Sequence, residues 1–306
     1  MKNYRIINLF RRMAVLMLAL AAAACSDWTE TEPVDLRVER PQNQDPALWA
    51  EYTAALRAYK QSPHFLTYAR LHNSPSPSTG EQDYMRCLPD SLDIVTLTNA
   101  DNFSRFDAED LPVLHEKGTR VLYQVDYAAR SEEFAGEAEL TAYLDAVIAA
   151  VAANGMDGYS FTTDPLDAAA TAAIVATLSA AKANGQLLVF EGDPLFVAEA
   201  DRAKIDYFVL DTETTTDVTT LKLQVAHATG YAGIAPERLL LAASAGAPLY
   251  DEDGAESAAI SGMAARVVSL GPLAGLAAYD LHNDYYDVAR NYPLLSDAIQ
   301  LLNPSK

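Results

Sequence analysis

The sequence predicts a single-domain α/β protein built as a (β/α)8 barrel. Eight short β-rich runs alternate with helical stretches rich in alanine and leucine, a pattern typical of a parallel sheet covered by helices. The chain has 306 residues, half of them apolar, and this length fits one eight-stranded barrel with a short leader. An open doubly wound sheet is the alternative. However, the Gly-x-Gly-x-x-Gly fingerprint expected of many such sheets does not follow the first predicted strand.

Each predicted element is assigned from a local pattern of apolar residues and turn formers. Strands are predicted at residues 64–71, 91–98, 120–125, 158–162, 187–191, 207–211, 238–243 and 275–279. Helices are predicted at residues 46–60, 137–154, 165–184, 219–230 and 255–270. Gly155 and Gly185 each follow an asparagine and predict C-terminal helix caps. The acidic run 251–254 lacks the rest of a calcium loop, so we expect a polar turn there.

The N-terminus has the features of an export signal. Residues 1–24 combine a basic start with a twelve-residue apolar run, which is too short to span a bilayer but typical of a signal peptide. Cys25 follows three alanines, an arrangement that resembles a bacterial lipobox in which this cysteine would carry the lipid. Ordinary signal cleavage beside an incidental cysteine is the alternative. Residues 25–45 are polar and acidic and predict a tether, so the barrel domain would span residues 46–306.

Charge and cysteine content narrow the possible partners. The chain carries 22 basic and 42 acidic residues, a net charge of −20. Four of the basic residues and none of the acidic ones lie in the leader, so the exported chain would have a charge of 18 minus 42, or −24. That balance argues against nucleic acid and anionic membrane surfaces as partners. If Cys25 is lipidated, Cys87 has no disulfide partner, and we expect it to be a small buried or half-buried residue.

In a barrel of this type the working residues lie at the C-terminal ends of the strands. The predicted ends combine aromatic, amide and carboxylate side chains, which suit a sugar because rings stack on its apolar face while polar groups bind its hydroxyls. Polar strand ends are common in any barrel, which is the plainer explanation. The five histidines show no metal-ligand spacing, and we expect neither a metal nor a cofactor. The candidate ligand-binding residues are Tyr68, Gln124, Asp126, Asp211, Tyr279 and Asp280.

The most specific motif spans the fourth predicted strand. Residues 157–164 read Asp-Gly-Tyr-Ser-Phe-Thr-Thr-Asp. They resemble the signature of glycoside hydrolase family 18, Asp-Gly-apolar-Asp-apolar-Asp-x-Glu. Ser160 and Thr162 stand where the family has aspartates, and Asp164 stands where it has the glutamate. Because alternate residues of a strand share one face, these three positions should face the barrel interior and its mouth.

The resemblance implies a fold, a chemistry and a ligand. In the family the glutamate protonates the glycosidic oxygen, the substrate's 2-acetamido group is the nucleophile, and the preceding aspartate stabilises the cationic ring. A threonine cannot supply that charge, and Asp164 is one methylene shorter than glutamate. A displacement of about 1 Å can cost ~100-fold in rate. Residues 88–95, 118–122 and 275–286 resemble a Bacteroidetes subgroup whose intact members look like endo-β-N-acetylglucosaminidases. In this resemblance Tyr279 corresponds to the aromatic floor for one sugar, and Asp211 to a contact on the sixth strand.

These observations lead to three hypotheses. The first is a catalytically impaired outer-membrane lipoprotein, exposed at the cell surface, that binds glycans containing N-acetylglucosamine. The second is an active endo-β-N-acetylglucosaminidase with Asp164 as general acid and Asp126 or Asp211 as the stabilising carboxylate. The third is a subunit of an outer-membrane glycan-uptake complex with no ligand of its own, which an occluded barrel mouth would favour.

Overall fold

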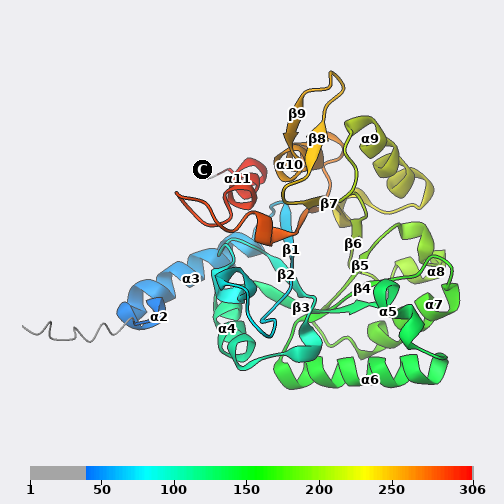
Figure 1. Cartoon of the computed structure of the whole chain (residues 1–306), viewed down its shortest axis with the longest axis horizontal. Coiled ribbons are helices and arrows are strands. Elements are labelled where there is room, and N and C mark those ends of the chain that lie inside the picture. The colour runs from blue at the N-terminus through cyan, green and yellow to red at the C-terminus, as the bar shows by residue number, and fades with distance from the viewer. Residues whose placement is uncertain (1–38, 305–306) are drawn as a thin grey trace, which may run out of the picture. The chain divides into compact units, whose positions relative to one another are not determined.

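A computed structural model describes residues 39–304 of the chain (Figure 1). The predicted signal peptide, Cys25 and most of the predicted tether lie outside the described residues. The chain divides into two compact units, with the boundary between Trp49 and Ala50. The barrel lies in the second unit. The last residues of the predicted tether are not extended, since a short helix, α2, covers Pro41–Gln44.

The eight parallel strands close into a barrel, which confirms the predicted fold class. The ring runs in chain order, and the first strand pairs with both the second and the last: Tyr68 lies opposite Ile94 on one side and Ala277 on the other. Three predicted strands have the observed bounds, and the other five differ by one to three residues at an end. The strands are β1 Leu66–Leu71, β2 Ile94–Leu97, β3 Arg120–Asp126, β4 Gly158–Thr162, β5 Leu187–Glu191, β6 Tyr207–Leu210, β7 Leu239–Ser244 and β10 Gly275–Tyr279.

Helices surround the ring of strands (Figure 1). The helix predicted at residues 137–154 has the observed bounds, and Gly155 caps it in the left-handed conformation at φ 71°. The helix predicted at 219–230 stops at Ala226 and continues as a π-helical turn over His227–Tyr231. The remaining bounds are α3 Pro46–Gln61, α4 Arg105–Glu116, α5 Tyr127–Arg130, α6 Glu137–Asn154, α7 Ala168–Ala181, α8 Glu199–Arg202, α9 Val218–Ala226, α10 Ala259–Ser269 and α11 Pro293–Leu302.

Two predicted helices, α7 and α10, have wrong bounds, and each difference has a local cause. Helix α7 starts three residues late because the Asp167 carboxylate caps it by accepting the Ala170 N–H. It ends at Ala181, ahead of Gly185, because Lys182 is already extended. Helix α10 starts at Ala259 because the residues before it pair in a hairpin, β8 Pro248–Tyr250 with β9 Glu256–Ala258. The acidic run 251–254 is the polar turn of that hairpin, as predicted.

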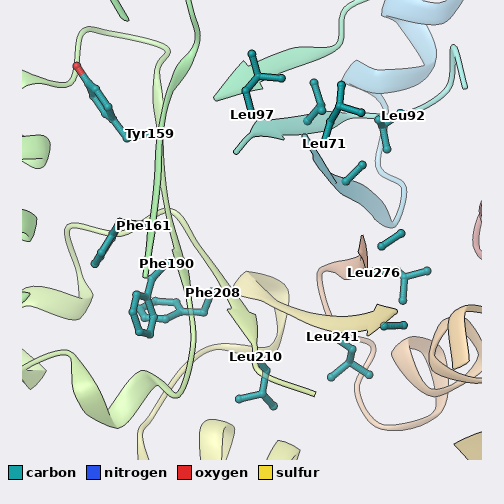
Figure 2. Packing of buried hydrophobic residues seen from close by; sticks show 14 of the residues in the cluster. Leu71, Leu92, Leu97, Tyr159, Phe161, Phe190, Phe208, Leu210, Leu241 and Leu276 are labelled. Carbon is teal, nitrogen blue, oxygen red and sulfur yellow. The ribbon is translucent and has the colours of Figure 1, made fainter. Parts of the chain in front are cut away.

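The strands alternate between two hydrophobic layers. Outward-facing side chains such as Phe161, Phe190 and Phe208 pack beneath the helices (Figure 2), with ring centroids 5.1 and 6.0 Å apart along this row. Inward-facing side chains fill the barrel itself, and they include Tyr68, Ile94, Leu122, Val189, Val209, Leu240 and Tyr279. The barrel interior is therefore a packed core, and ligand chemistry is confined to its upper end.

A repeated device fixes the lower end of the barrel. An aspartate immediately before each of β2, β4 and β6 accepts the N–H of the second residue of the preceding strand and also binds a histidine or lysine. Asp93 binds the Thr67 N–H and His64. Asp157 binds the Val121 N–H and His115. Asp206 binds the Leu188 N–H and Lys182. Each aspartate thus ties two adjacent strands together where the ring begins.

Candidate functional site

The first half of the strand-four motif has a structural role. The Asp157 carboxylate accepts the Val121 N–H at 2.8 Å and belongs to the repeated lower-end device. Gly158 has a φ of 131°, and a Cβ built on it would lie 2.0 Å from the Leu187 carbonyl oxygen. Only glycine fits this close approach between β4 and β5. The Asp-Gly pair therefore serves the barrel and not its chemistry.

The second half of the motif faces the interior but presents hydroxyls that are already bonded. Ser160 is fully buried, and its Oγ lies 2.5 Å from the Thr96 hydroxyl on β2. The Thr162 hydroxyl donates to the Asp126 carboxylate at 2.7 Å and accepts the Ala128 N–H. These bonds join β2, β3 and β4, and Asp126 is the carboxylate to which Thr162 is bonded.

Asp164 lies beyond the end of β4, in the turn that leads to α7. Its Oδ1 accepts the N–H of Leu166, two residues on, at 2.9 Å, a side-chain turn typical of aspartate before a proline-containing bend. The side chain is partly exposed. Asp164, at the acid position of the motif, is thus hydrogen-bonded to the backbone of its own loop.

The centre of the barrel mouth is a carboxylate on another strand, Glu191 at the end of β5. It is 5% exposed, and both of its oxygens are fully bonded. Oε1 accepts the Tyr68 hydroxyl at 2.9 Å and the Gln124 amide at 3.0 Å, while Oε2 accepts the Tyr279 hydroxyl at 2.7 Å and the Arg70 guanidinium at 2.8 and 3.3 Å. We call these five side chains the central network.

The charges of the central network compensate one another. Burial alone would raise the pKa of Glu191, but the Arg70 charge and the hydrogen bonds from Tyr279, Arg70 and Gln124 lower it. Burial, followed by the Glu191 charge, raises the pKa of Tyr68 and Tyr279 well above the ordinary tyrosine value. The network therefore consists of one carboxylate, one guanidinium and neutral donors, a combination that satisfies a buried charge.

Arg70 also binds the aromatic ring of Tyr279 and reaches toward the rim. Its guanidinium carbon lies 3.7 Å from the Tyr279 ring centroid, a cation–π contact. Its Nη1 lies 3.7 Å from the Glu213 carboxylate. Burial raises the pKa of Glu213, and the nearby charges of Asp211 and Asp280 raise it further against the opposing effect of Arg70. Asp211 and Asp280 themselves are exposed on the rim.

The structure thus brings the candidate ligand-binding residues into three groups. Tyr68, Gln124 and Tyr279 meet in the central network, Asp126 meets Thr162, and Asp211 and Asp280 lie on the outer rim. Glu191 was not among the predicted site residues, although it ends a predicted strand. The signal was available, because residues 187, 189 and 191 share the inward face of β5.

Exposed aromatic side chains stand on the loops that follow the strands. Phe196 after β5 is 40% exposed, Tyr250 in the hairpin after β7 is 37% exposed, and Tyr286 after β10 is 70% exposed. Tyr285, by contrast, is buried, and its hydroxyl donates to Glu81 at 2.8 Å. Phe196, Tyr250 and Tyr286, which we call the rim aromatics, offer apolar faces to solvent on the mouth side of the barrel.

A cavity of about 1200 Å³ opens at the opposite, N-terminal end of the barrel, between α3, the start of β1 and the end of α11. Several of its polar groups are used within the protein: Lys60 donates to two carbonyls and the Thr119 hydroxyl, and Asn303 bonds both backbone groups of Phe65. This end of such barrels serves stability. We therefore place the candidate site at the mouth.

Membrane spans and metal clusters are both missing from residues 39–304. In this range no helix is long and apolar enough to cross a membrane. No group of three or more His, Cys, Asp and Glu side chains there is arranged to hold a metal ion.

The fold and part of the sequence are similar to those of glycoside hydrolase family 18. The profile of glycoside hydrolase family 18, BT1044-like, matches residues 29–158 and so ends where the motif's altered positions begin. No curated protein matches the sequence.

Solved structures show the same fold at low sequence identity. A selenomethionine form of BT1044 with a Glu-to-Gln substitution is 16% identical, with a TM-score of 0.67 over 87% of this chain and 96% of that one. The endo-β-N-acetylglucosaminidase of Cordyceps militaris is 18% identical, with a TM-score of 0.64 over 82% and 95% of the two chains. YKL-39, solved in the presence of chitooligosaccharides, is 10% identical, with a TM-score of 0.62 over 79% and 100%.

Proposed function

We propose that this chain is a non-catalytic, glycan-binding lipoprotein of the bacterial outer surface, built on a family 18 barrel. The observation that carries the proposal is the state of the motif. Ser160 and Thr162 replace the family's two aspartates and are bonded inside the barrel, and Asp164 is bonded within its own turn. A general acid must reach the leaving oxygen, and a charge must lie beside the cationic ring. Neither requirement is met by these three side chains.

The ligand class is supported by the rim aromatics and by the structural relatives. Exposed tyrosine and phenylalanine rings on the mouth loops suit the apolar faces of sugars. YKL-39 shares the fold and was crystallised with chitooligosaccharides, and the Cordyceps relative is an endo-β-N-acetylglucosaminidase. We therefore propose that the ligand is a glycan containing N-acetylglucosamine. Anchoring through Cys25 rests on the lipobox-like sequence.

Binding can be tested by titrating the purified chain with N-glycans and chitooligosaccharides in a calorimeter. Replacing Tyr286 by alanine should weaken binding about 5- to 10-fold, since one stacked ring is worth about 1 kcal/mol. Tyr231→Ala is the matched control, because Tyr231 is 75% exposed on the π-helical turn outside the mouth loops. Equal affinities for both variants and the unmodified chain would show that Tyr286 does not contact the glycan, which contradicts binding at the rim aromatics.

Catalysis can be tested by incubating N-glycosylated protein with the chain and with its Asp164→Ala variant, with release read by mass spectrometry. We expect no glycan release from either. Release that is lost in the variant would instead support an active endo-β-N-acetylglucosaminidase, in which Asp126, close to Thr162, is the candidate second carboxylate. If the chain neither releases nor binds a glycan, the third hypothesis, a subunit of a glycan-uptake complex, is favoured.

A further inference from the structure

One face of a buried aromatic ring at the barrel mouth is covered by a neighbouring side chain. Tyr279, at the end of β10, is 3% exposed. The guanidinium of Arg70 lies over its ring at 3.7 Å, and the Arg70 side chain is itself 29% exposed. Arg70 therefore stands between this face of Tyr279 and solvent.

A guanidinium and a sugar ring compete for such a face. The planar guanidinium and the C–H face of a pyranose both stack on aromatic rings, and one ring face holds only one of them. Arg70 is held in place, because Glu191 binds it through two hydrogen bonds at 2.8 and 3.3 Å. Glu191 is held in turn by Tyr68 and Gln124. The covering group is thus part of a bonded core and not a loose surface chain.

We propose that the Arg70 guanidinium covers the face of the Tyr279 ring and thereby keeps sugar rings out of the inner part of the barrel mouth. Resting on the proposed glycan-binding function, this inference places the ligand on the outer rim aromatics Phe196, Tyr250 and Tyr286. The favoured ligand is then an extended chain lying across the mouth, and a short saccharide that depends on an inner pocket has no place to bind.

The test is a titration of the full chain with N,N′-diacetylchitobiose. We expect no binding by the unmodified chain and at least a tenfold gain in affinity when Arg70→Ala is combined with Glu191→Gln, which removes the covering guanidinium without leaving a buried charge. Glu213→Gln alone, which leaves both Arg70 and Glu191 unchanged, is the matched control and should show no gain. Adding Tyr279→Ala to the double variant should abolish the gain. A folded double variant that gains nothing would overturn the inference.

A measurement on the unmodified chain decides the question if the double variant does not fold. The Arg70 Nε–H resonance should exchange slowly with water and should not move when the disaccharide or a long glycan is added. A shift of this resonance on adding the disaccharide would show that sugar reaches the inner face, which contradicts the closure.

If the unmodified chain binds no glycan but the double variant gains affinity for the disaccharide, the closure stands and the proposed rim binding fails. If the unmodified chain binds long glycans but the double variant gains nothing, rim binding stands and the closure fails.

Discussion

Replacing Glu191 by alanine would remove the acceptor that holds the central network together. Four side chains donate to this carboxylate, and the change would leave the Arg70 charge beside a void without its partner. Breaking a buried ion pair by removing one partner costs about 3–5 kcal/mol. Domains are stabilised by only about 5–15 kcal/mol in total. The variant should therefore lose a large part of its free energy of unfolding.

For a domain of this size, each kcal/mol shifts Tm by about 2–4 °C, so we expect Tm to fall by roughly 6–20 °C. Urea denaturation and calorimetry measure both quantities. Glu213→Ala is the matched control: Glu213 also approaches Arg70, but at 3.7 Å and with a side chain 31% exposed, so its loss should be close to neutral. Pairing Glu191→Gln with Arg70→Met should recover much of the stability, because no buried charge remains and the amide oxygen still accepts from the neighbouring donors. A loss below about 1 kcal/mol for Glu191→Ala would refute the structural role argued for the network.

Two further predictions concern the lower end of the barrel. Hydrogen bonds to aspartates raise the pKa of His64 and His115 above the ordinary value. The two protonated histidines therefore stabilise the fold fully below about pH 6.5, and this stabilisation is lost as the pH rises through their raised pKa values. Thermal melts should show that replacing both histidines by glutamine lowers Tm more at about pH 5.5 than at about pH 8.5; an equal loss would contradict the linkage. Separately, Gly158→Ala should cost more than about 1 kcal/mol because its Cβ would meet the Leu187 carbonyl. Gly155→Ala, also at positive φ but with open space around it, should cost less, and equal losses in urea denaturation would argue against the clash.

Local sequence patterns were sufficient where an element is determined by its own residues. The strands at 158–162, 187–191 and 275–279 and the helix at 137–154 have the predicted bounds because apolar periodicity and a glycine cap define them. The hairpin of β8 and β9 was missed because its strands are three residues long and one of them reads as the start of a helix. The network was missed for a different reason. Arg70 and Glu191 are 121 residues apart, and only closure of the ring brings β1 and β5 into reach across the barrel.

The hydrogen bonds of the central network indicate that Glu191 stabilises the barrel mouth. A general acid needs a proton to give, but the pKa of Glu191 is lowered and its oxygens accept five hydrogen bonds from four side chains. A nucleophile needs a free lone pair directed at the substrate, and these bonds leave none accessible. Two of the positions that agree with the family 18 signature, Asp157 and Gly158, serve the contacts between strands. The positions that differ, Ser160, Thr162 and Asp164, are hydrogen-bonded within the protein, to Thr96, Asp126 and Leu166 in turn.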